Sequence, residues 1–143
     1  MGALVALRVV AAVIWPTIND VTTDTTPEYP DLKAQRFARP PEVVFAAAVA
    51  VAHEMQFETI EQSPQKGVIQ AVATTPVLRF KDDVTITVHR EAEQTVVNLR
   101  SHSRIGKGDL GANTRRIREF QARLAKELAG PSPAPDLRKK RPG

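Results

Sequence analysis

The side chains best suited to chemistry gather in residues 98–116, Asn-Leu-Arg-Ser-His-Ser-Arg-Ile-Gly-Lys-Gly-Asp-Leu-Gly-Ala-Asn-Thr-Arg-Arg. Their guanidinium, hydroxyl and amide groups can bind a carboxylate or a phosphate, since a guanidinium offers a forked pair of N–H donors. Val97 and Leu99 alternate with polar residues, as in a half-buried strand. Three glycines follow: Gly106, Gly108 and Gly111. The pattern predicts a strand, a glycine loop and a helix with polar side chains concentrated at the junction.

The helix after the glycine loop is expected to have Asp109 as its N-cap, because an aspartate accepts hydrogen bonds from the first free N–H groups. Apolar residues recur at helical spacing at Leu110, Ile117, Phe120, Leu124 and Leu128. The N–H groups at the helix start, flanked by arginine and lysine, suit a carboxylate or phosphate group. Walker, nucleophile-elbow, dinucleotide and zinc-protease motifs are absent from the sequence.

Two adjacent carboxylates, Asp82 and Asp83, come just before a predicted strand. Adjacent residues in extended chain point to opposite sides, so these carboxylates cannot share one proton as a catalytic dyad does. One of them is expected to turn toward the junction and form a forked pair with an arginine, which would order the junction with or without a ligand. The candidate partners are Arg100, Arg104, Arg115 and Arg116.

The helices and strands that hold these side chains are expected to form an α+β domain. A helix is expected to begin at Pro41, where the missing N–H is not needed, and the apolar run that follows must be covered by the sheet and by the last helix or the N-terminal segment. Four strands follow: Phe57–Gln62, Val68–Thr75, Val84–Arg90 and Thr95–Ser103. Their short links predict a four-stranded antiparallel meander in the order α-β-β-β-β-α, with both helices on one face.

Period-two alternation distinguishes the two faces of this sheet. The helix-covered face is expected to hold Val84, Ile86, Val88, Val97 and Leu99. The opposite face is expected to hold Thr85, Thr87, His89, Asn98, Arg100, His102 and Arg104. That polar face is either simply solvated or a surface of concentrated positive charge.

Composition predicts one globular domain over residues 16–130 of the 143-residue chain. The net charge is +4, but the tail 131–143 holds four basic residues and one acidic residue, so the body is close to neutral and is not expected to bind nucleic acid specifically. The proline-rich tail is expected to be disordered and to bind anionic lipid or nucleic acid weakly. The chain contains no cysteine, which excludes disulfides and thiolate catalysis.

The N-terminal segment, residues 1–15, contains an apolar run closed by Pro16. It is shorter than the roughly 20 apolar residues that a membrane-spanning helix needs. Three interpretations stay open: the end of an anchor that begins upstream, an interfacial helix, or a helix packed on the domain. Its deletion is expected to change location more than folding.

The block Asn19-Asp20-Val21-Thr22-Thr23-Asp24 is expected to form Asx and Thr turns that pin an extended segment onto the domain. Asp20 and Asp24 could also be ligands of a hard cation. The block lacks the glycine turn and the converging oxygens of a calcium loop, so no metal site is expected.

Three blocks in one order, namely residues 19–24, the segment Phe80-Lys81-Asp82-Asp83 and the junction after Arg100, resemble the bacterial domain-of-unknown-function 1499 family over about Pro16 to Leu128. The resemblance implies no activity. Family members often carry hydrophobic segments ahead of the first block, which favours an anchor, and often have His where this chain has Asn19. The motif positions are Asp20, Thr22, Thr23, Asp24, Asp82, Asp83, Arg100, Ser101, Ser103, Arg104, Gly106, Asp109, Gly111, Asn113 and Arg116.

Two classes of function follow. The favoured one is a non-enzymatic binding or structural domain of the cell envelope, periplasmic or membrane-associated, that binds a small anionic group or a protein partner at the junction; the cytoplasm is the alternative location. The other class is a hydrolase or transferase that uses an Asp with a serine or His102, but the sequence places no base beside a nucleophile. No cofactor is indicated. An open pocket holding Ser101, Arg104 and an Asp would favour ligand chemistry, whereas buried, mutually paired side chains would favour an organising network.

Overall fold

The computed structural model describes residues 19–105 and 111–130. The expectations for the hydrophobic segment 1–15, for Gly106 and Asp109 in the glycine loop, and for the basic tail 131–143 therefore lie outside the described residues. Within the described part, no helix is both long and apolar enough to cross a membrane.

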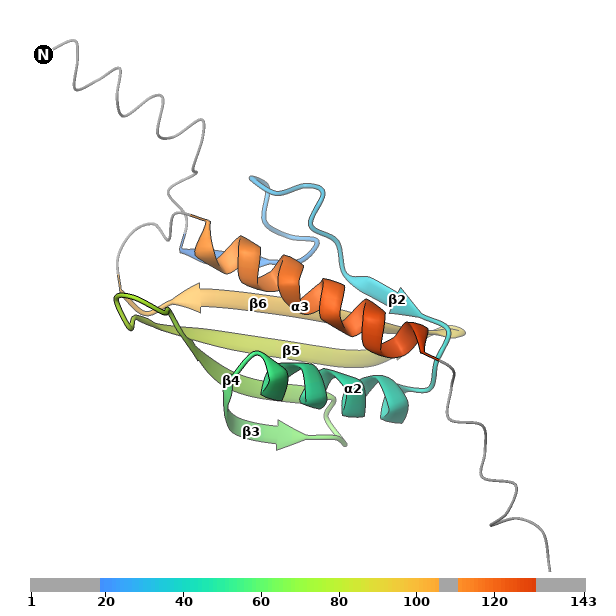
Figure 1. Cartoon of the computed structure of the whole chain (residues 1–143). Helices are drawn as coiled ribbons and strands as arrows, with labels where there is room; N and C mark the ends of the chain where they lie inside the picture. Colours follow the sequence, from blue (N-terminus) through green and yellow to red (C-terminus); the bar gives the residue numbers. More distant parts are fainter. Residues whose placement is uncertain (1–18, 106–110, 131–143) are drawn as a thin grey trace, which may run out of the picture.

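An antiparallel sheet of six strands is the framework of the domain (Figure 1). The strands are β1 Asp20–Thr22, β2 Gln35–Phe37, β3 Glu58–Ser63, β4 Val68–Thr74, β5 Lys81–Glu91 and β6 Gln94–Ser103. The order across the sheet is β1-β6-β5-β4-β3, and β2 also pairs with β6. Strands β3 to β6 form the predicted meander, whose short hairpin links favour antiparallel pairing.

Strands β1 and β2 extend the sheet beyond the four predicted strands. Each contains three residues, which is too short for period-two alternation to be recognised in a sequence. Strand β1 pairs with the end of β6 and β2 with its beginning. Strand β5 also begins at Lys81, earlier than the predicted Val84, so that Asp82 and Asp83 belong to the strand and lie opposite Ser103 and His102.

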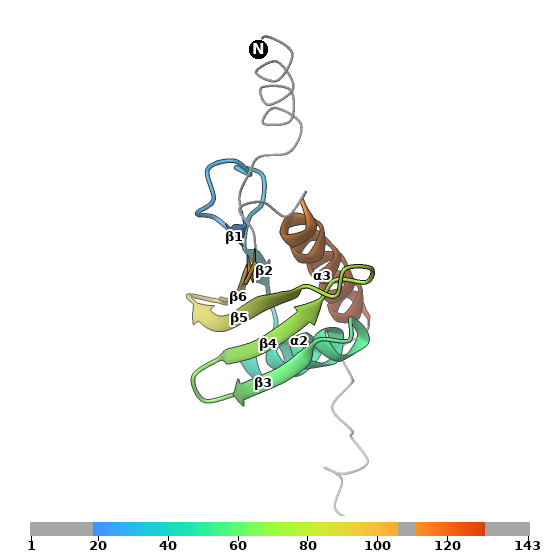
Figure 2. The same ribbon diagram turned by 90° about the vertical axis from the view of Figure 1, so that its left-hand side faces the viewer.

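Two helices, α2 Pro41–Glu54 and α3 Ala112–Ala129, lie on one face of the sheet, as predicted (Figure 2). Helix α2 begins at Pro41, where the sequence placed it. Helix α3 begins later than predicted: Gly111 takes the N-cap position in place of Asp109, with a φ of 81°. A residue with a Cβ adopts this left-handed conformation at a cost, so glycine suits the position.

The core lies between this sheet face and the helices, and it confirms the predicted register. Val84, Ile86, Val88, Val97 and Leu99 are all buried. Helix α3 contributes the predicted stripe of Ile117, Phe120, Leu124 and Leu128. Burial of a large aliphatic or aromatic side chain typically contributes about 1.5–3 kcal/mol, so this face holds the domain together. The alternating residues of β5 and β6 consequently point to the other face.

Candidate functional site

The sheet separates the predicted junction residues into two groups. On β6, Ser101 and Ser103 are buried under α3, whereas Arg100 is exposed on the opposite face, and Arg104, the residue after β6, is exposed as well. The same alternation on β5 sends Asp82 inward and Asp83 outward. We call the buried group the inner cluster: Asp82, Ser101, Ser103, Asn113 and Arg116. We call the exposed group the outer pairs: Asp20–Arg100 and Asp83–Arg104.

The inner cluster is a connected hydrogen-bond network. Ser101 Oγ donates to Asn113 Oδ1 at 2.6 Å, and Asn113 Nδ2 donates to Ser103 Oγ at 2.8 Å. Arg116 Nη1 donates to Ser101 Oγ and to Asn113 Oδ1, both at 3.1 Å. Asn113 Nδ2 also donates to the backbone oxygen of Asn19 at 3.2 Å. One asparagine on α3 is thus bonded to β6 and to the residue that precedes β1.

A buried ion pair completes the inner cluster. Arg116 Nη1 lies 2.7 Å from Asp82 Oδ2, and the two side chains are 11% and 2% exposed. Among the described residues, this carboxylate oxygen receives no hydrogen bond of good geometry, so the charge of Arg116 is what compensates it. A buried charge that loses its partner is strongly destabilising. The inner cluster therefore has the buried, mutually paired arrangement expected of an organising network.

The outer pairs are forked and half-exposed. Arg100 donates through Nε and Nη2 to the two carboxylate oxygens of Asp20 at 2.9 and 2.6 Å. Arg104 donates through Nε and Nη2 to Asp83 at 2.8 to 3.1 Å. These hydrogen bonds lower the pKa of both aspartates and raise the pKa of both arginines. An anion would have to displace a carboxylate to use either arginine.

The block around β1 pins the chain to the sheet, as the turn-forming residues predicted. Thr23 Oγ1 donates to Asn98 Oδ1 at 2.9 Å and accepts from the backbone N–H of Leu99 at 3.1 Å. Asp24 Oδ1 accepts from the backbone N–H of Ala34 at 2.9 Å. The N–H of Thr22 donates to a neighbouring threonine hydroxyl at 2.7 Å. No group of three or more metal-ligating side chains occurs in the part of the chain that the structure describes.

His102 cannot serve Ser101 or Ser103 as a base. It lies between them on β6, so its side chain points to the opposite face of the sheet. Both serine hydroxyls are instead hydrogen-bonded to Asn113. Ser101 and Ser103 therefore lack the contact with His102 that a nucleophile and its base need in a serine-dependent hydrolase.

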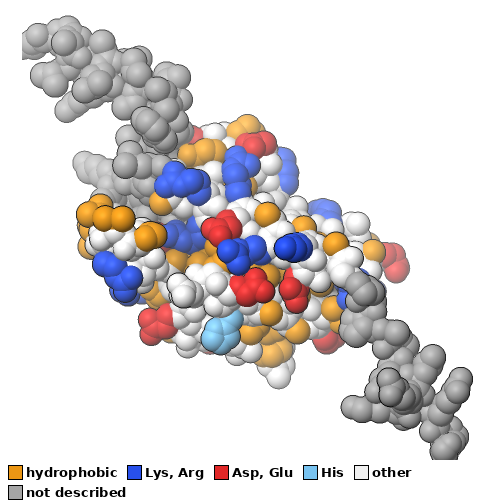
Figure 3. All heavy atoms as spheres, in the orientation of Figure 1, with side chains coloured by type: hydrophobic (Ala, Val, Ile, Leu, Met, Phe, Trp, Pro, Cys, Tyr) orange, Lys and Arg blue, Asp and Glu red, His pale blue; other side chains and the backbone are white. Residues whose placement is uncertain are grey.

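An open groove of about 720 Å³ lies beside the inner cluster, between the end of α2, the first half of α3 and the loop after β4. Its charged lining residues are Arg79, Arg115, Arg116, Arg123, Glu54 and Glu119. Lys/Arg and Asp/Glu side chains gather across this region in the space-filling view (Figure 3). We call this feature the arginine groove.

Two arginines of this groove were not predicted as site residues. Arg123 donates to Glu119 at 3.0 Å and lies 3.5 Å from Glu54. It follows Arg116 and Glu119 at helical spacing, so the sequence did contain a signal for this side of α3. Arg79 adopts a φ of 59° in the loop between β4 and β5, and its side chain has no ion pair within residues 19–105 and 111–130. No local pattern in the sequence predicts that Arg79 lines the groove, because its position depends on the folded loop.

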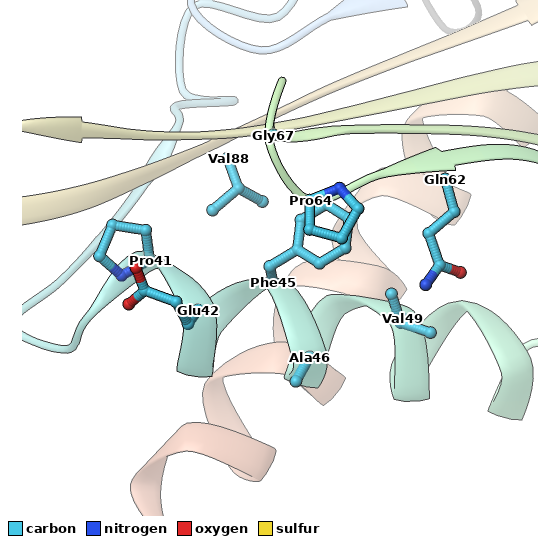
Figure 4. Close-up of a pocket in the computed structure, with 9 residues that line it drawn as sticks. All are labelled: Pro41, Glu42, Phe45, Ala46, Val49, Gln62, Pro64, Gly67 and Val88. Atoms are coloured by element: carbon cyan, nitrogen blue, oxygen red, sulfur yellow. The ribbon is translucent and has the colours of Figure 1, made fainter.

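A second hollow, of about 390 Å³, lies between α2 and the turn that joins β3 to β4 (Figure 4). Its lining is mostly apolar and includes Phe45, Val49 and Pro64; Glu42 lines it at the end near Pro41. Gly67 has a φ of +67° here, and a Cβ on it would lie 2.0 Å from the backbone oxygen of Val88. The turn therefore requires glycine, and the hollow has the character of an apolar crevice.

The fold and the inner cluster define a small α+β domain in which a buried polar network joins the last helix to the sheet. The chain belongs to the family described as "Protein of unknown function (DUF1499)", whose model matches residues 12–124. No curated protein matches the sequence significantly.

Several solved structures resemble the fold at low identity. Ara h 8.0201 has a TM-score of 0.40 and 11% identity, over 78% of this chain and 98% of that one. TTHA0849 from Thermus thermophilus has a TM-score of 0.42 and 13% identity, over 79% and 99%. CalU16 from Micromonospora echinospora has a TM-score of 0.31 and 12% identity, over 77% and 95%. Similarity at this level carries no information about function.

Proposed function

We propose that this protein is a non-enzymatic binding domain of the cell envelope and that it binds a small anionic group in the arginine groove. The observation that carries the proposal is that Arg116 belongs both to the inner cluster and to the lining of the arginine groove. Its guanidinium is fixed by the inner cluster, and the same residue lines the groove. In this proposal the inner cluster is the rigid floor of the groove, and the ligand binds chiefly to the exposed arginines that line the groove around Arg116.

The charges of the groove support an anionic ligand. Four arginines and two glutamates line it, which leaves an excess of positive charge. Guanidinium groups bind carboxylates and phosphates through forked hydrogen bonds. Ala112, the first residue of α3, also lines the groove, and the positive end of a helix dipole favours an anion there.

The proposed location depends on the sequence ahead of the domain. Residues 3–15 are apolar except for Arg8. Such a run can associate with a bilayer as part of an anchor or as an interfacial helix. The anion site and the location are separate parts of the proposal and can be tested separately.

The anion site is tested by thermal unfolding of the full chain in phosphate, pyrophosphate or citrate, with sodium chloride at matched ionic strength as the reference. A ligand that binds only the folded state raises its stability, by about 2.7 kcal/mol at 100 times the Kd. Arg79→Ala and Arg123→Ala should lose this increase while keeping the melting temperature measured in chloride.

The matched control is Arg118→Ala. Arg118 also lies on α3, but it pairs with Asp31 at 2.9 Å and does not line the groove. This variant should respond to the anions as the wild type does. Equal responses in all the variants, or no response in the wild type, would contradict the anion site.

A further inference from the structure

We infer that the loop between β4 and β5 forms, together with Ile105, a surface that contacts an anionic lipid bilayer. We call it the apolar tip, and it consists of Val77, Leu78, Phe80 and Ile105. The inference rests on the envelope location proposed above. It shares Arg79 with the arginine groove, but the four apolar side chains of the tip do not line that groove. The occupant that we propose is the headgroup and upper acyl region of the bilayer.

The apolar tip concentrates exposed hydrophobic side chains at one end of the domain. Val77, Leu78, Phe80 and Ile105 are 88%, 67%, 43% and 64% exposed. The N–H of Arg104 donates to the backbone oxygen of Lys81 at 3.2 Å, so Ile105 and Phe80 leave the sheet side by side. Hydrophobic side chains are visible at this end, at the left of Figure 3, where Figure 1 places the loop. A cluster of this kind marks an interaction surface.

The loop that carries the apolar tip is closed by its own hydrogen bonds. The N–H of Thr75 donates to the backbone oxygen of Phe80 at 2.9 Å, and the N–H of Phe80 donates to Thr75 Oγ1 at 2.8 Å. The N–H of Arg79 donates to the backbone oxygen of Thr75 at 3.1 Å. Backbone groups that are already bonded can approach an apolar phase at low cost. The side chains therefore project from a preformed loop.

The charges around the apolar tip favour an anionic membrane over a neutral one. Arg79 and Lys81 flank the apolar side chains and are exposed. The neighbouring carboxylates are neutralised, because Asp82 pairs with Arg116 inside the domain and Asp83 pairs with Arg104. Basic residues beside exposed apolar ones are typical of surfaces that bind anionic lipid.

The chain enters the domain at the same end. The N–H of Ser103 donates to the backbone oxygen of Asn19 at 2.7 Å, and Ser103 is close in sequence to Ile105. The apolar residues 3–15 precede this point in the sequence. The apolar tip therefore lies at the end of the domain where the described chain begins.

The experiment uses the absence of cysteine from the chain. Leu78→Cys in the full chain is labelled with a polarity-sensitive fluorophore and mixed with vesicles of phosphatidylcholine, with or without phosphatidylglycerol. We expect a blue shift and protection from an aqueous quencher with the anionic vesicles. The matched control is Ile60→Cys, since Ile60 is 63% exposed but lies on the edge strand β3; its label should not change.

A charged substitution gives a second measurement. Leu78→Asp should weaken sedimentation with anionic vesicles at least about tenfold, because a charge is excluded from the apolar layer, whereas Ile60→Asp should not. An unchanged label at position 78 on vesicle-bound protein would mean that other parts of the chain make the contact, such as residues 3–15 or the basic tail, and would overturn the inference. So would the absence of vesicle binding, or a label at position 78 that is shielded before lipid is added, which would indicate cover by the protein itself. Thermal unfolding in phosphate tests the arginine groove separately, because it does not involve vesicles.

Discussion

The inner cluster and the outer pairs both contain Asp–Arg pairs in which an aspartate of β5 takes part, and yet the environments of these pairs are opposite. Asp82 and Asp83 are neighbours, and each meets an arginine at 2.7 to 2.8 Å. Asp82 is buried with its partner, whereas the side chain of Asp83 is 48% exposed. Water and salt weaken the exposed pair, while a broken buried pair leaves a charge without solvent. The face of the sheet therefore decides the energetic role of an Asp–Arg pair.

The largest expected effect is that of Asp82→Ala. This variant leaves the guanidinium of Arg116 buried without its counter-charge, and such a loss typically costs about 3–5 kcal/mol. The free energy of unfolding in urea measures it. The adjacent substitution Asp83→Ala is the matched control and should cost far less. Similar losses for the two variants would show that burial does not distinguish the two groups.

A smaller effect is expected for Asn113→Leu. The substitution removes the acceptor of Ser101 and the donor to Ser103, so buried polar groups are left unsatisfied at a typical cost of about 1–3 kcal/mol. Asn98→Leu, on the outer face of β6, is the comparison and should cost less. Urea unfolding of both variants measures the two losses of unfolding free energy. A larger loss for Asn98→Leu would contradict the expectation that the inner face contributes more to stability.

Arg100→Ala should cost at most about 1 kcal/mol, because its pair with Asp20 is half-exposed. The loss should become smaller in concentrated salt, which screens exposed charges. The loss caused by Asp82→Ala should persist in salt, since its pair is buried. Unfolding at low and high sodium chloride therefore distinguishes the exposed pair from the buried one, and equal salt sensitivity of the two losses would contradict this distinction.

The smallest expected effect is on acid unfolding. The outer pairs lower the pKa of Asp20 and Asp83 below the ordinary value of about 3.9. Their contribution to stability is therefore fully present above that value and is lost as pH falls through the lowered pKa values. The double variant Asp20→Asn, Asp83→Asn should have a shallower decline in urea midpoint below about pH 4. If the urea midpoints of variant and wild type fell in parallel with pH, the outer pairs would contribute nothing to the pH dependence of stability.

The local features of the fold could be predicted from the sequence. The start of α2 at Pro41, the four strands of the meander and the buried stripe of α3 follow from propensity and periodicity along the chain. Period-two alternation also separated the faces, so that Val97 and Leu99 are buried and Arg100 is exposed, as predicted. It further predicted that Asp82 and Asp83 would point to opposite sides.

Which polar groups contact one another could not be predicted, because these contacts depend on how distant segments pack. Asp20 joins Arg100 because β1 pairs with β6, and a strand of three residues has too short a pattern to reveal that pairing. Asp82 pairs with Arg116 because α3 packs on the inner face of the sheet, where Asp82 points. From the sequence, four arginines were candidate partners. Arg79 reaches the groove through a loop whose conformation depends on the β4–β5 pairing. Periodicity is a local property of the chain, but contacts depend on the register between segments that are distant in sequence.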